Sequence, residues 1–188
     1  DSKCVIGFQN YSKELFEELL NLNNNQKYTE IVSERDRFTK VFSDETGALT
    51  AVVSTSPIHY EKNKEWVDID NTLVSSKDSL INKSNSFSVA LPDELGVSES
   101  IELKNSDYSI SFTLQGTDLF ENNKKVTAQK KEKSNKNESK SKNKIDTDFL
   151  DKNVAVSYSE VGENTDIEYT VTSTGIKENI VLNKKPKS

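Results

Sequence analysis

The chain's only tryptophan and only histidine, Trp66 and His59, lie close together in the sequence, beside Asp68 and Asp70. An aromatic ring beside carboxylates suits sugar binding, because the ring stacks on a sugar face while the carboxylates accept hydrogen bonds from hydroxyl groups. Tyr60, next to His59, could extend such a surface. These five residues are therefore the candidate ligand-binding residues.

Two other interpretations of the same residues stay open. In the first, a neighbouring helix or loop covers Trp66, and the stretch is part of the packing. In the second, Asp68 and Asp70 form the acid–base pair of a glycosidase, since same-face positions two apart on a strand are separated by about 7 Å. Carboxylates so placed do not flank a substrate bond, however, and near a turn both would be ionised at neutral pH. We therefore predict no catalytic residues.

The remaining motifs also predict a chain without metal or cofactor. Asp68, Asp70 and Asn71 resemble the start of a calcium loop, but the glycine and the terminal glutamate of such a loop are missing. One histidine cannot build a zinc site, and Cys4 is the only cysteine, so no internal disulfide is possible. The sequence has no glycine-rich phosphate loop and no serine nucleophile elbow.

A strand must position the candidate residues. In EWVDIDNTLV, side chains alternate between two faces, so Val67 and Ile69 share a core face while Trp66, Asp68 and Asp70 share the other. The turn at residues 62–64 joins this predicted return strand to ALTAVVSTSPIHY. Arg35 and Arg37, which precede the first strand, are expected to pair with carboxylates.

The rest of the chain repeats this pattern of short alternating strands separated by turns. We expect a mainly β fold, either an antiparallel β-sandwich or two small β units. Leucines at helical spacing in residues 11–27 predict one N-terminal helix. A parallel sheet is not expected, because no helices lie between the strands.

Residues 122–147 differ from the rest of the chain in charge. They hold nine lysines and three acidic residues, a local net charge of +6, so the remainder carries −12. With few apolar residues, this segment is predicted to be a disordered, Lys-rich insert, with a polyanion-binding arm as the alternative. A basic patch outside the folded part is atypical of a nucleic-acid-binding domain, and we expect no nucleic acid partner.

The predicted domain organisation follows from these segments. Residues 1–34 form an N-terminal helical segment, residues 35–121 a first β unit, residues 122–147 the flexible insert and residues 148–188 a second β unit that completes the fold. A loose likeness between AVVSTSPIHYEKNKEWVDID and AVSYSEVGENTDIEYTV favours two related units on either side of the insert. The sequence lacks methionine, so we expect a module of a longer product, and no stretch is apolar enough to span a membrane.

Two runs resemble the N-terminal β-rich region of secreted, wall-associated RHS/YD-repeat proteins of Gram-positive bacteria. They cover roughly residues 35–74 and 153–182. The first has Arg37, Lys-x-Phe at 40–42, a glycine turn at Gly47, Pro-x-His-Tyr at 57–60 and the strand WVDIDNTL. The second has an Asp-Ile-Glu-Tyr strand and a closing strand KENIVL.

The resemblance implies a secreted or cell-wall-associated protein whose downstream domains, on the same polypeptide, are this module's partners. We therefore expect a non-enzymatic structural or attachment module. The alternative is a carbohydrate-binding module that uses Trp66, Asp68 and Asp70, for which cell-wall glycan is the candidate ligand.

Overall fold

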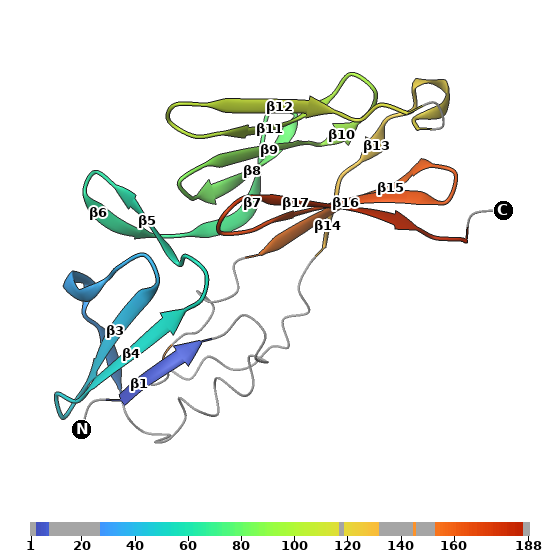
Figure 1. Cartoon of the computed structure of the whole chain (residues 1–188). Coiled ribbons are helices and arrows are strands. Elements are labelled where there is room, and N and C mark those ends of the chain that lie inside the picture. Colours follow the sequence, from blue (N-terminus) through green and yellow to red (C-terminus); the bar gives the residue numbers. More distant parts are fainter. Residues whose placement is uncertain (1–2, 8–26, 117–118, 132–144, 146–152, 186–188) are drawn as a thin grey trace. The chain divides into compact units, whose positions relative to one another are not determined.

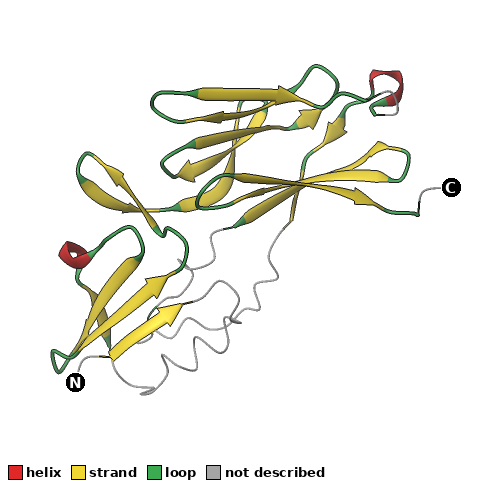
Figure 2. Ribbon diagram, in the orientation of Figure 1, coloured by secondary structure: helices red, strands yellow, loops and turns green. Residues whose placement is uncertain are grey.

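The computed structural model describes residues 3–7, 27–116, 119–131, 145 and 153–185 (Figure 1). The mainly β class is confirmed, since strands dominate the described residues and most of them pair antiparallel (Figure 2). The predicted helix at 11–27 lies outside the described residues except for its last position. The chain divides into two compact units, the first holding the described residues up to Ile69 together with Ile145, and the second holding the other described residues from Asp70 onward.

The first unit contains a four-stranded sheet and a separate hairpin. The sheet has the order β1-β4-β3-β2, and the hairpin joins β5 to β6. Their bounds are β1 Lys3–Gly7, β2 Tyr28–Glu30, β3 Thr39–Asp44, β4 Leu49–Ser54, β5 His59–Lys62 and β6 Glu65–Asp68, with a short 3-10 helix η1 at Val32–Glu34.

Local sequence explains the two turns of this unit. Between β3 and β4, the Asp44 carboxylate accepts hydrogen bonds from the backbone of Thr46 and Ala48, and Gly47 takes a φ of 84°. Between β5 and β6, Asn63 and Lys64 have φ values of 55° and 67°. A two-residue turn with positive φ at both positions matches the twist of a hairpin.

One pairing differs from the expected antiparallel pattern. β1 pairs with β4 in parallel, with Cys4 opposite Ala51. Parallel neighbours need a connection of a dozen or more residues, and the chain between Gly7 and Leu49 is longer than that. The expectation rested on the absence of helices between strands from residue 38 onward, and β1 precedes that region.

The predicted return strand EWVDIDNTLV is divided between the two units. It forms β6 up to Asp68 and β7 at Asp70–Ser76, which belong to different sheets. The intervening Ile69 is buried, and its amide donates to the carbonyl oxygen of Ile58 at 2.9 Å. This bond extends the backbone pairing of the β5–β6 hairpin by one position, after which the chain enters β7 in another sheet.

The second unit consists of a five-stranded sheet, a four-stranded sheet and one short strand pair. The orders are β12-β11-β9-β8-β7, β14-β15-β16-β17 and β10-β13. Their bounds are β8 Ser79–Ser84, β9 Ser88–Pro92, β10 Glu94–Leu95, β11 Ser100–Lys104, β12 Ser109–Thr113, β13 Val126–Thr127, β14 Gln129–Lys131, β15 Val154–Gly162, β16 Thr165–Val171 and β17 Ile176–Leu182, with a 3-10 helix η2 at Glu121–Asn123.

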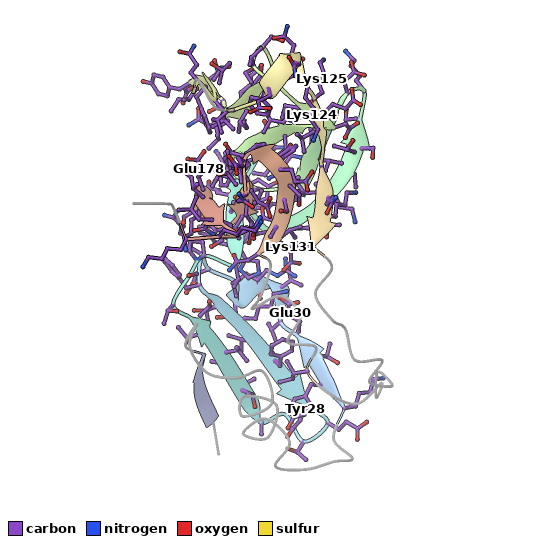
Figure 3. All side chains as sticks on the ribbon, turned by 90° about the vertical axis from the view of Figure 1, so that its right-hand side faces the viewer. Tyr28, Glu30, Lys124, Lys125, Lys131 and Glu178 are labelled. Carbon is purple, nitrogen blue, oxygen red and sulfur yellow. The ribbon has the colours of Figure 1, made fainter. Side chains whose placement is uncertain are left out.

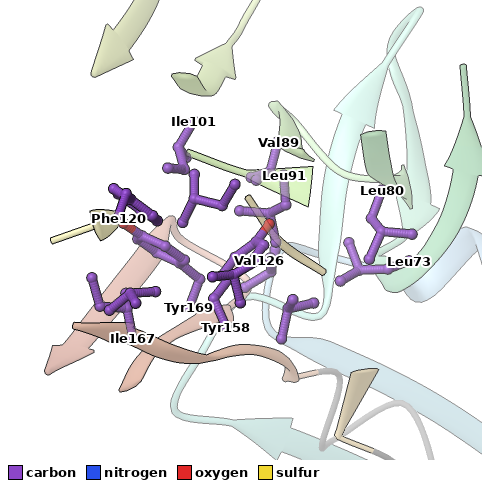
Figure 4. Packing of buried hydrophobic residues seen from close by; sticks show 14 residues of the cluster. Leu73, Leu80, Val89, Leu91, Ile101, Phe120, Val126, Tyr158, Ile167 and Tyr169 are labelled. Carbon is purple, nitrogen blue, oxygen red and sulfur yellow. The ribbon is translucent and has the colours of Figure 1, made fainter. Parts of the chain in front are cut away.

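Alternating apolar residues of both large sheets meet in one core (Figure 4). Leu91 and Ile101 of the five-stranded sheet share it with Val156 and Tyr169 of the four-stranded sheet. The hydroxyl group of buried Tyr158 donates to the carbonyl oxygen of Pro92 at 2.6 Å. Burial of apolar surface at roughly 25 cal/mol per Å² is therefore the main term that holds the two sheets together.

Because of this shared core, the boundary between the two units differs from the boundary that the sequence predicted. Residues 35–121 and 148–188 were predicted as separate β units, but strands from both ranges contribute to the one core, and the division falls between Ile69 and Asp70.

The first part of the predicted Lys-rich insert is folded, which corrects that prediction for Val126–Lys131. Val126 is buried in the core, and β14 pairs with β15. The lysines find partners there: Lys130 Nζ donates to the carbonyl oxygen of Leu73 at 3.0 Å, and Lys131 pairs with Glu168. Residues 132–144 and 146–152 lie outside the described part of the chain. Among the residues that the structure describes, no helix is long and apolar enough to cross a membrane.

Candidate functional site

Four ionisable side chains surround the side chain of Asp68 in the first unit. Glu30 ends β2, Arg35 follows η1, Lys40 lies in β3, and His59 and Asp68 lie opposite each other in the β5–β6 hairpin (Glu30 is labelled in Figure 3). We call these residues the Asp68 cluster. It brings two of the predicted site residues, His59 and Asp68, together with three charged residues of other elements.

Arg35 links the two carboxylates of the cluster. Its Nε and Nη2 atoms donate to the two oxygens of Glu30 at 2.6 and 3.0 Å, a bidentate geometry. Nη2 also donates to Asp68 Oδ2 at 3.2 Å, and Nη1 to the Trp66 carbonyl oxygen at 3.2 Å. The expectation that Arg35 pairs with carboxylates is confirmed. One guanidinium thereby holds the end of β2 against the hairpin strand β6.

Lys40 is the most deeply buried cation of the cluster. Its side chain points inward from β3, in phase with the buried Phe42. Its ammonium nitrogen lies 2.5 Å from Asp68 Oδ1 and 3.5 Å from Glu30 Oε2. A buried ammonium is costly unless it is paired, and here two carboxylates provide the pairing.

His59 is 0% exposed and is held on both sides of its ring. Nδ1 lies 2.6 Å from the carbonyl oxygen of Asp36, which can only accept, so Nδ1 carries a proton. Nε2 faces Asp68 Oδ1 at 3.4 Å. The ring is thus fixed between the backbone and a carboxylate that already contacts Lys40.

These contacts lower the pKa of both carboxylates. The pKa of Asp68 is held well below its usual range, first by His59 and then by Lys40 and Arg35, which together outweigh the opposing effect of burial. Burial by itself would raise the pKa of Glu30, but the hydrogen bond from Arg35 and the charge of Lys40 lower it on balance. Both groups are therefore anionic at neutral pH, and neither can act as a general acid there.

Trp66 is half-buried, on the strand face that also carries Asp68. Its partner across the hairpin is Glu61, and its carbonyl oxygen accepts from Arg35. The ring is thus neither a core residue nor an open platform. The neighbouring Asp68 carboxylate is occupied by cations of the fold, which leaves it little capacity to accept hydrogen bonds from a sugar.

Asp70 and Tyr60 are not among the five residues of the Asp68 cluster. Asp70 begins β7 in the second unit, where Oδ1 accepts from the Thr72 amide at 2.9 Å and Oδ2 lies 3.7 Å from Lys83 Nζ. Tyr60 pairs with Val67 across the hairpin, on the face opposite to His59. Asp68 and Asp70 therefore do not share one strand face, because Ile69 separates two strands of different sheets.

Sequence reasoning did not find Glu30 and Lys40. Lys40 carried a usable signal, because it alternates in phase with the apolar Phe42 along β3 and lies opposite the buried Val52, and a lysine on a core face needs a buried carboxylate partner. Glu30 gave no such signal, since β2 has only three residues and shows no clear alternation.

The described residues contain no group of three or more His, Cys, Asp or Glu side chains placed to hold a metal ion. Comparison of the chain with protein-family models, curated proteins and solved structures finds no match.

Proposed function

We propose that this chain is a non-catalytic structural module of a large secreted or cell-surface protein of the RHS type. The observation that carries the proposal is the Asp68 cluster, in which the side chains best suited to chemistry are engaged with one another. Arg35, Lys40 and His59 surround a carboxylate whose pKa is lowered, the opposite of what a general acid requires.

The cluster has a mechanical consequence within the first unit. Glu30 and Lys40 belong to the sheet, whereas His59 and Asp68 belong to the hairpin, so their contacts fix the hairpin to the sheet. Removing one partner of such a network leaves an uncompensated charge, which strongly destabilises the fold. A module that transmits position or force between neighbouring domains benefits from this kind of fixed connection.

The resemblance of residues 35–74 and 153–182 to RHS/YD-repeat proteins supports the cellular context. It favours a secreted or wall-associated location, with the downstream domains of the same polypeptide as partners. Reading the full gene product tests this part: YD-type repeats downstream would support it, and a protein that ends near residue 188 would contradict it.

The second candidate is carbohydrate binding through Trp66. Its supporting observation is that the ring is only half-buried and lies on the same face as Asp68. Titration of soluble peptidoglycan fragments into the parent chain and into Trp66→Ala separates the two functions. Binding that the substitution abolishes, without a change in melting temperature, would favour the sugar-binding module.

The non-catalytic part of the proposal is tested by product release. The parent chain and Asp68→Asn are incubated with peptidoglycan and a polysaccharide panel, and soluble products are measured by chromatography. We expect no release from either protein. Release by the parent that Asp68→Asn eliminates would overturn the proposal.

A further inference from the structure

The core-facing side of β12 is only partly covered at the edge of the second unit: Phe112 packs against the core, whereas Ile110 does not. β12 is the last strand of the five-stranded sheet in the described part of the chain. Phe112 lies opposite the fully buried Ile101, and Ile110 lies opposite Leu103, which packs against the core. Both therefore point to the core side of the sheet, yet Ile110 is 65% exposed.

The edge strand of the other sheet shows the same feature. β17 ends the four-stranded sheet in the same part of the chain, and Ile180 lies opposite the buried Ile167. Ile180 thus faces the core side as well, but it is 64% exposed. The two sheets share a core that stays open along these two edges.

A groove of about 630 Å³ lies between the two edges. Phe112 and Leu114 line it from the β12 side, and Tyr169, Ile176 and Glu178 line it from the β16–β17 side (Glu178 is labelled in Figure 3). Glu178 accepts a hydrogen bond from the Tyr169 hydroxyl group at 2.6 Å, so the one carboxylate of the groove is engaged within the fold. The groove therefore has a mixed apolar and polar lining, which includes Thr113 and Gln115, and it is bordered by open strand edges.

Edge strands usually carry devices that prevent pairing with another chain, such as lysines on the strand. β14, at the opposite edge of the four-stranded sheet, has them in Lys130 and Lys131. β12 has the sequence SISFT, without charge, proline or glycine. This strand therefore lacks the usual protection.

We propose that β12 pairs antiparallel with β12 of a second copy of this chain, about a two-fold axis at Ser111. In that register Ile110 of each copy lies opposite Phe112 of the other, and Ser111 lies opposite itself. On the core side of the sheet, apolar side chains of the two copies lie opposite each other. On the outer side, hydroxyl groups of serine and threonine lie opposite each other, and no two like charges are paired. Pairing about a two-fold axis opposes positions of the same strand face, and β12 carries no charge that a second copy would repel, so a second copy of β12 meets the requirement of a two-fold interface.

Sedimentation velocity of the full chain over a wide concentration range tests the pairing. We expect a monomer–dimer equilibrium that Ile110→Lys weakens by roughly tenfold or more in dissociation constant. Val97→Lys is the matched control, because Val97 is 47% exposed and lies outside both edge strands. Thermal melts of both variants establish that they are folded.

Cross-linking tests the register separately. In a Cys4→Ser background, Ser111→Cys places two thiols at the two-fold axis, within reach of an interchain disulfide, whereas Ser109→Cys places them apart. We expect oxidised dimer from Ser111→Cys and much less from Ser109→Cys. A chain that stays monomeric at all concentrations, a dimer unaffected by Ile110→Lys, or equal cross-linking at both positions would each overturn the proposal.

Discussion

At the scale of single residues, Asp68 shows how one carboxylate can suggest a site from sequence and serve the fold in the structure. Sequence placed it beside Trp66 as a hydrogen-bond acceptor for a ligand. The structure surrounds it with Arg35, Lys40 and His59, so its acceptor capacity is largely used. Sequence analysis could single out Asp68, His59 and Arg35. It could not predict the strand register that places His59 opposite Asp68, or the burial of the Lys40 side chain.

The first prediction concerns the stability that Asp68 contributes. Asp68→Asn should lower the free energy of unfolding at neutral pH by about 1–3 kcal/mol, because the cations of the cluster lose a charged partner. Urea unfolding followed by Trp66 fluorescence measures this, since Trp66 is the only tryptophan and lies beside the cluster. Asp70→Asn is the matched control, because asparagine also accepts the bond from the Thr72 amide.

The difference between the parent and Asp68→Asn should depend on pH. The folded-state pKa of Asp68 is depressed, so its stabilising contribution is full above the unfolded-state pKa of about 4 and decreases as the pH falls below it. Repeating the urea series at acidic pH should therefore bring the two proteins closer together. A difference that grows under acid would contradict this assignment.

The second prediction concerns the tautomer of His59. Because Nδ1 faces the Asp36 carbonyl oxygen, the proton on Nδ1 should be present in the folded protein and exchange slowly with solvent. Long-range ¹H–¹⁵N correlation spectra report this from a single ring, as His59 is the only histidine. A ring that carries its only proton on Nε2 would show that the Asp36 contact is wrong.

At the scale of elements, the strands and tight turns could be predicted from the sequence, whereas the points at which the chain passes from one sheet to another could not. Alternation and turn residues indicated β3, β4 and the β5–β6 hairpin, since these signals are local. The break at Ile69 depends on the membership of β7 in a sheet that extends to β12, and β14 depends on backbone pairing with β15. Such partners come from distant parts of the sequence, and composition alone made the lysines of β14 resemble a mobile loop.

The third prediction tests whether the start of the Lys-rich segment is folded. Val126 is buried in the core of the second unit, so Val126→Ala should lower the free energy of unfolding by about 1–3 kcal/mol. The neighbouring exposed Thr127→Ala should change it by less than about 0.5 kcal/mol. Chemical unfolding followed by circular dichroism measures both. Equal, small effects would mean that this segment does not pack as described.

At the scale of the whole molecule, the chain consists of two units with different means of stabilisation. The second unit has one apolar core shared by two sheets, whereas the first relies on a charged cluster to fix its hairpin. Periodicity predicted a mainly β fold. It could not predict the division at Ile69, because that depends on which strands share a core rather than on any local change in composition.

The proposed structural role rests on the Asp68 cluster, so its most direct test is a double-mutant cycle between Lys40 and Asp68. The free energies of unfolding of the parent, Lys40→Met, Asp68→Asn and the double variant are compared by Trp66 fluorescence. The structure predicts a coupling free energy of about 0.5–2 kcal/mol, because the two groups contact each other at 2.5 Å, with the Lys40 side chain buried and the Asp68 side chain 44% exposed. Additive effects of the two substitutions would show that the pair does not stabilise the fold, and would contradict the structural role proposed for this site.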